Sequence, residues 1–252
     1  MKARGFLVAS ALAAGCQYDW TPPPADATKV DAGGSSDAAS AADASSSFTC
    51  AGALLCDRFD TGPIGATWAN TFVATGGDVH VEAFAGALSL PNVLFASRPA
   101  QTAPPSTAYV TSVLTTKLTR AKIAFAVHPD QLDATAHVCV AGITFGDGTA
   151  DEKNVRVLVG QAGALVQEKA PTLRALPLTT APAVGAWSRM SLAVEASGHI
   201  VVTLDGATVL DAAADPSWAA STSTRVFVGV NFVEAPSKAV ELRFDDVRVD
   251  GS

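Results

Sequence analysis

The chain has 252 residues, of which 48 % are hydrophobic and only 16 % charged, and its formal net charge is −7. This length suits one large β-sandwich or two small domains. The acidic balance repels phosphate backbones, and no basic stripe with interleaved aromatic residues is found. The sequence therefore argues against nucleic-acid binding.

Residues 1–15 have the features of a secretory leader. Lys2 and Arg4 precede an apolar run at 5–14, which is too short for a membrane span of about 20 residues. The run ends in "LAAGC", which resembles the lipobox of bacterial lipoproteins, with Ala13 where that family most often has Leu. The resemblance implies a signal peptide at 1–15 and a lipid on Cys16 that anchors the chain to a membrane. The alternative is an ordinary signal peptide with Cys16 as an unmodified thiol.

The residue after the cysteine influences which membrane a lipoprotein is sorted to. In the Gram-negative sorting rule, Asp at this position favours the inner membrane, and here it is Gln17. The resemblance therefore implies an exported lipoprotein of the outer membrane.

Residues 16–49 are dominated by Ala, Ser, Asp, Gly and Pro. Such a segment buries too little apolar surface to offset its ordering entropy, so it is predicted to be a disordered linker. A folded domain is predicted over 50–252. Cys50 and Cys56 are predicted to form a disulfide, because an exported chain meets an oxidising compartment. Cys139, in the apolar "HVCVAGITF", is predicted to be a buried, inert thiol.

From residue 57 onward the sequence shows no long amphipathic helix but many short runs of alternating or doubly apolar residues. These predict strands at 78–84, 87–91, 108–115, 122–128, 137–145, 153–160, 187–196, 199–204, 225–233 and 240–250. Asp205-Gly206 between apolar runs predicts a tight hairpin. In the last run, Val240, Leu242 and Phe244 are out of phase with Val247 and Val249, which predicts a β-bulge at Asp245-Asp246.

Three segments resemble concanavalin-A-like (laminin-G-like) jelly rolls. They are "GAWSRMSLAVEASGHIVVTLDGATVL" at 185–210, the closing "VELRFDDVRVDG", and "LLCDRFDTG", which is similar to the opening strand. Together they imply an all-β fold, a two-sheet antiparallel jelly-roll sandwich of the lectin or glucanase kind.

The known catalytic motifs are missing. The glucanase branch of this superfamily uses a Glu-x-Asp run whose carboxylates share one sheet face, and the sequence contains no Glu-x-Asp. Gly-x-Ser-x-Gly, Gly-rich phosphate loops and His-x-x-x-His are also missing. The sequence therefore predicts that the chain is not an enzyme.

Candidate ligand residues remain. His80 and Glu82 share a strand face, and Trp218 in "ADPSWAAS" is a loop aromatic that can stack on a sugar. Asp147, Asp151, Glu152 and Asn154 lie in "FGDGTADEKN" and offer oxygen ligands for calcium. A polar strand face, core packing and a solvated hairpin loop are the respective structural alternatives.

These observations predict an anchored, non-enzymatic cell-envelope protein that binds a polysaccharide or another envelope component. Two alternatives stay open: a structural or adhesion protein that binds a protein partner, and a divergent carbohydrate hydrolase or lyase on the same scaffold.

Overall fold

The computed structural model describes residues 48–74, 76–100, 107–116, 118–146, 153–169, 173–215, 223–234 and 237–252. They belong to one compact unit, Ser45–Ser252. The leader, Cys16, the linker up to residue 47, Asp147, Asp151, Glu152 and Trp218 lie outside these ranges, so the expectations for them stay predictions. No helix in the described ranges is long and apolar enough to cross a membrane.

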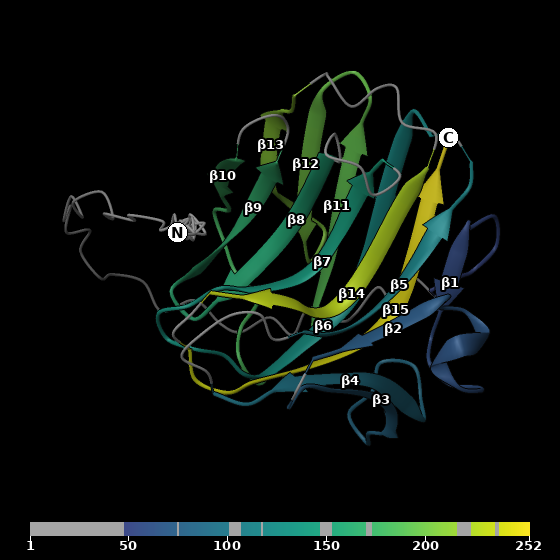
Figure 1. Ribbon diagram of the computed structural model, residues 1–252, viewed down its shortest axis with the longest axis vertical. Helices are drawn as coiled ribbons and strands as arrows, with labels where there is room; N and C mark the ends of the chain where they lie inside the picture. Colours follow the sequence, from purple (N-terminus) through teal and green to yellow (C-terminus); the bar gives the residue numbers. More distant parts are fainter. Residues whose placement is uncertain are drawn as a thin grey trace, which may run out of the picture. The chain divides into compact units, whose positions relative to one another are not determined.

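The described residues form two antiparallel sheets, as Figure 1 shows. Sheet A has the order β13-β12-β11-β6-β15-β4-β3, with β1 paired to β15, and sheet B has the order β10-β9-β8-β7-β14-β5-β2. The strands of sheet A are β1 (Leu55–Asp57), β3 (Asp78–Ala83), β4 (Asn92–Arg98), β6 (Arg120–Gln131), β11 (Ser188–Glu195), β12 (His199–Leu204), β13 (Ala207–Ala213) and β15 (Val240–Gly251). Those of sheet B are β2 (Asn70–Val73), β5 (Ala108–Leu114), β7 (Val138–Phe145), β8 (Lys153–Gly160), β9 (Gly163–Lys169), β10 (Leu173–Pro177) and β14 (Thr224–Val233), and a short 3-10 helix, η1, spans Ile64–Ala66.

Alternating side chains from both sheets make one core. Val226, Val228 and Val230 of β14 are fully buried in it, together with Leu242 and Phe244 of β15. A period of two places every second residue of a strand between the sheets, which is why short alternating runs fold into a sandwich. The predicted fold class, an antiparallel two-sheet sandwich, is confirmed.

Two predicted local features are present. The register of β15 against β6 shifts between Asp245 and Arg248, and Asp246 has a φ of 49°. This bulge returns Val247 and Val249 to the core, where both are fully buried.

The predicted hairpin turn has a φ of 50° at Asp205 and 83° at Gly206, and it joins β12 to β13.

One predicted strand is wrong. Residues 87–91 form bends rather than a strand, and β4 begins at Asn92. The backbone N–H and hydroxyl of Ser89 instead donate to the carboxylate of Asp245, at 2.8 and 2.6 Å. These bonds hold the segment against the bulge of β15 instead of in a ladder.

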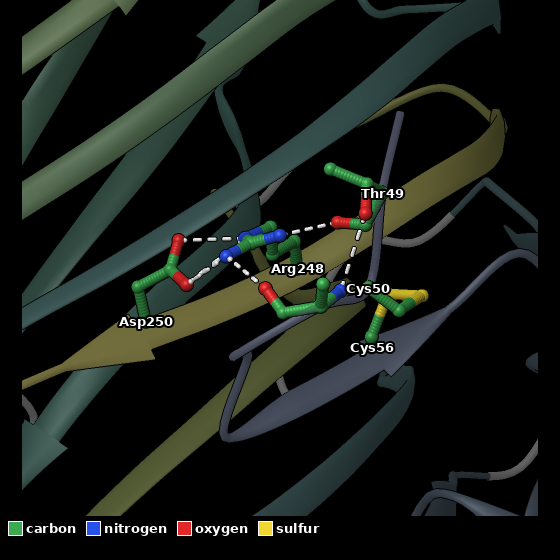
Figure 2. Close-up of polar contacts among 6 residues, drawn as sticks. Thr49, Cys50, Cys56, Arg248 and Asp250 are labelled. Carbon is green, nitrogen blue, oxygen red and sulfur yellow. Dashed lines mark hydrogen bonds and ion pairs between the residues drawn. A yellow bond between two sulfur atoms is a disulfide. The ribbon is translucent and has the colours of Figure 1, made fainter. Parts of the chain in front are cut away.

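The N-terminal end of the domain is fastened to the last strand (Figure 2). Cys50 and Cys56 form the predicted disulfide, with Cα atoms 5.5 Å apart. The Arg248 guanidinium donates to the carbonyls of Thr49 and Ala51, the latter at 3.1 Å, and pairs with Asp250 at 2.7 Å. We call this group of contacts the N-terminal clamp.

Candidate functional site

The outer face of sheet B, turned away from the core, carries a second and smaller apolar cluster. Cys139, Leu158 and Phe227 are buried there, with Tyr109, Leu165 and Phe232 packed against them. Burial raises the pKa of the Cys139 thiol to about 12, so the thiol is protonated at neutral pH. The prediction that Cys139 is buried is confirmed.

Two glycines allow large side chains to lie close together on this face. Tyr109 of β5 lies opposite Gly229 of β14, and Phe227 of β14 lies opposite Gly142 of β7, which in turn pairs with Arg156 of β8. A Cβ at Gly142 would come within 2.5 Å of the Phe227 ring, and Gly229 has a φ of 121°. The chain therefore needs glycine at both positions to hold Phe227 and Tyr109 side by side.

The Tyr109 hydroxyl lies in a cationic environment. Burial raises the pKa of Tyr109, while Arg225, Arg156 and a hydrogen bond with the Asn231 side chain act in the opposite direction by favouring the phenolate. Tyr109, Arg156, Arg225 and Asn231 are each partly exposed, so a ligand can reach them. We call these four residues the Tyr109 site.

Arg156 can donate a further hydrogen bond. Its Nε is buried and has no hydrogen-bond partner among the described residues. A buried donor without a partner is costly, and an incoming carboxylate oxygen would satisfy it.

The charge of this face is one-sided. Among the described residues of the sheet B strands whose side chains alternate to the outer face, the charged ones are Arg156, Arg225 and Lys169, and none is Asp or Glu. The chain as a whole has a net charge of −7. Cations placed on one face of an acidic protein attract an anionic ligand to that face.

The predicted calcium loop reaches the described residues only at Asn154. Asn154 is buried, and its side-chain oxygen accepts a 2.6 Å hydrogen bond from Thr144 Oγ1. Within the described part of the chain, no group of three or more His, Cys, Asp and Glu residues is arranged to hold a metal ion.

His80 and Glu82 do come together, but on the outer face of sheet A. His80 Nε2 lies 3.6 Å from Glu82 Oε2, and Glu82 also accepts a 2.8 Å hydrogen bond from Arg243. Arg243 in turn lies over the Phe84 ring at 4.4 Å. The pair belongs to a network of mutual ion pairs and is on the opposite outer face from the Tyr109 site.

The sequence analysis missed all four residues of the Tyr109 site. Their one signal was a polar side chain alternating with core residues in the runs around Tyr109, Arg156 and Arg225. That signal is common to any half-exposed strand, and only the pairing of β5, β14, β7 and β8 gathers these residues.

The fold is similar to that of several proteins of known structure, although no protein-family model and no curated protein sequence matches the chain. The alginate lyase vAL-1 from Chlorella virus is similar with a TM-score of 0.57 at 14 % identity, over 75 % of this chain and 95 % of that one. An endo-β-1,4-glucuronan lyase from the fungus Trichoderma reesei has a TM-score of 0.55 at 12 % identity, over 73 % and 91 % of the two chains. The cellulose-induced protein Cip1 has a TM-score of 0.55 at 13 % identity, over 79 % and 97 %.

These neighbours contradict the prediction that the chain is not an enzyme. That prediction used the missing Glu-x-Asp run of glucanases, whereas the solved sandwiches similar to this one include lyases. Lyases cleave by elimination rather than by hydrolysis, so the pair of carboxylates that glycoside hydrolysis uses is not a requirement for them.

Proposed function

We propose that the chain is a polysaccharide lyase that cleaves an anionic polymer of uronic acids on the outer face of sheet B. The observation that carries the proposal is the environment of the Tyr109 hydroxyl, which lies in the field of Arg156 and Arg225 and bonds with Asn231. Alginate and glucuronan, after which the two similar lyases are named, are polymers of uronic acids. A shared fold does not determine function, so it is the site that supports this substrate class.

Elimination from a uronate moves one proton and breaks one bond. A base removes the proton at C5, the electron pair forms the C4=C5 double bond, the C4–O4 bond breaks, and O4 takes up a proton. The carboxylate of the sugar itself, which is bonded to C5, must be neutralised, because negative charge builds on it when the C5 proton leaves. Arg156, Arg225 and the Asn231 amide supply charge and hydrogen bonds of the required kind.

Tyr109 is the group that can transfer the proton. The groups around the Tyr109 hydroxyl are two arginines, an amide and the Cys139 thiol. Arginine and amide side chains are not bases at neutral pH, and the thiol, with a pKa of about 12, stays protonated. Tyr109 would therefore take the C5 proton as a phenolate and return it to O4 as a phenol, so one residue completes the proton balance. Since burial raises its pKa, the phenolate fraction and the activity should rise toward alkaline pH.

The test is cleavage of alginate, polyglucuronate and a neutral glucan by the full chain, followed by the ultraviolet absorbance of the unsaturated product. We expect cleavage of at least one uronan and none of the neutral glucan. Tyr109→Phe should lower kcat by about 100-fold or more, because general acid–base catalysis contributes at least that much. Arg156→Gln and Arg225→Gln should each lower kcat/KM by about tenfold or more.

Arg120→Gln is the matched control. It removes one positive charge from sheet A, where Arg120 is 54 % exposed and lies 3.5 Å from Glu195. This variant should behave as the parent does. A parent that cleaves no uronan, or a Tyr109→Phe variant with the parental rate, would falsify the proposal.

A further inference from the structure

Strand β2 exposes an aromatic ring at the edge of sheet B. All four of its residues are exposed, and the side chain of Phe72 remains 47 % accessible. Natural sheets avoid large apolar side chains on edge strands, because such edges pair with other chains. The exposed ring of Phe72 is therefore open to a ligand at this edge.

The ring of Phe72 adjoins the Tyr109 site. Phe72 lies opposite Tyr109 in the register of β2 and β5, and the two rings stack at 5.1 Å with an interplanar angle of 17°. One ring face of Phe72 thus covers Tyr109. Because β2 is the last strand at this edge of the described sheet, no further strand of the sheet covers the other face of the ring.

A polar side chain accompanies the ring. Asn70 precedes Phe72 by two residues, so it alternates to the same side of β2, and it is exposed. In the register it lies opposite Thr111, on the line that continues across the sheet through Phe227 and Gly142 to Arg156. The edge strand therefore offers an apolar ring face and an amide on the side that carries the Tyr109 site.

We infer that Phe72 and Asn70 form a sugar-binding subsite at the edge of sheet B, which takes a pyranose ring of the polymer; the inference rests on the proposed function. The C–H face of a pyranose stacks on an aromatic ring, and an amide can donate to and accept from its hydroxyls. A sugar bound here is a near neighbour of the one at Tyr109. Its binding energy fixes which bond of the polymer lies at the Tyr109 hydroxyl.

The test measures the affinity of the full chain for an oligouronate by calorimetry, in parallel with cleavage. Phe72→Ala should weaken binding by about five- to tenfold, Asn70→Ala by about threefold, and Phe72→Tyr, which keeps the ring, by less than about twofold. Phe72→Tyr, which keeps a ring over Tyr109, should also keep the pH dependence of any cleavage.

Val73→Ala is the control for loss of an exposed apolar side chain. Val73 is 52 % exposed on the same strand but alternates to the opposite side, so its replacement should leave the affinity unchanged.

Two results would overturn the subsite: parental affinity in Phe72→Ala, or a loss of affinity in Val73→Ala as large as in Phe72→Ala. The outcomes that contradict the proposed function differ from those that contradict the subsite. A parent that binds oligouronates through Phe72 but yields no unsaturated product keeps the subsite and contradicts the lyase, whereas a parent that binds none contradicts both.

Discussion

Two buried aspartates show how the surroundings of one residue type set opposite pH responses. Asp133 accepts hydrogen bonds from the backbone N–H groups of Lys238, Thr135 and Ala136, and these bonds lower the pKa of Asp133 to about 2. Asp245 is fully buried in the bulge of β15, and burial raises its pKa to about 6. The first group favours the carboxylate in the folded state, and the second favours the acid.

We predict that the free energy of unfolding rises and then falls with pH. Asp133 binds fewer protons when folded, so its contribution is present above the unfolded pKa of 3.8 and is lost as the pH falls toward 2. Asp245 binds more protons when folded, so its contribution is present below 3.8 and is lost as the pH rises through 6. Urea unfolding across this pH range measures both effects.

Single variants separate the two contributions. Asp133→Asn should lower the free energy of unfolding at neutral pH by about 2 kcal/mol and make the acid limb shallower, since Glu234, whose pKa is also lowered, still contributes to it. Asp245→Asn should reduce the decline between pH 4 and 6, to which Asp57 and Asp246, whose pKa values burial also raises, contribute the rest. The control Asp78→Asn, whose side chain is 58 % exposed, should change neither limb. An acid limb as steep in Asp133→Asn as in the parent would contradict this account.

At the level of elements, the N-terminal clamp should stabilise the domain through β15. The disulfide closes a short loop before β1, and Arg248 ties the carbonyls ahead of it to the last strand. Replacing Cys50 and Cys56 by Ser should lower the free energy of unfolding by roughly 2 kcal/mol. Arg248→Gln should lower it by a smaller amount, because the ties to the carbonyls are lost while the disulfide remains.

Limited proteolysis gives an independent reading of the clamp. Both variants should be cut faster than the parent at residues 48–54, while the sandwich stays folded. Equal rates of cutting in all three proteins would show that the clamp does not hold this segment.

The sequence predicted the elements better than it predicted their arrangement. Alternation identified β7, β8, β11, β12 and β14, and the phase change in β15 predicted its bulge, because both are local consequences of side chains alternating between two faces. Strands β2, β4, β9 and β10 escaped prediction. In β9, Gln167, Glu168 and Lys169 interrupt the apolar pattern.

The Tyr109 site was out of reach for a different reason. Its residues come from β5, β8 and β14, which lie far apart in the chain, and their proximity follows from strand order and register. Neither is encoded in the alternation of a single strand.

The described strands of one face differ in charge from the chain as a whole. A net charge of −7 coexists with an outer face of sheet B whose described strand residues carry positive charges only. Such a distribution attracts a polyanion to one side of the domain, and its effect weakens as salt rises. The lipid anchor at Cys16 stays a prediction.

The most direct test of the central claim is the mass of the products that the full chain makes from a uronate oligosaccharide of defined length. Elimination adds no water, so the masses of the two fragments should sum to that of the substrate, and one fragment should carry the C4=C5 double bond. Fragments whose masses sum to the substrate plus one water would identify a hydrolase. That result, or an intact substrate at every pH, would contradict the account.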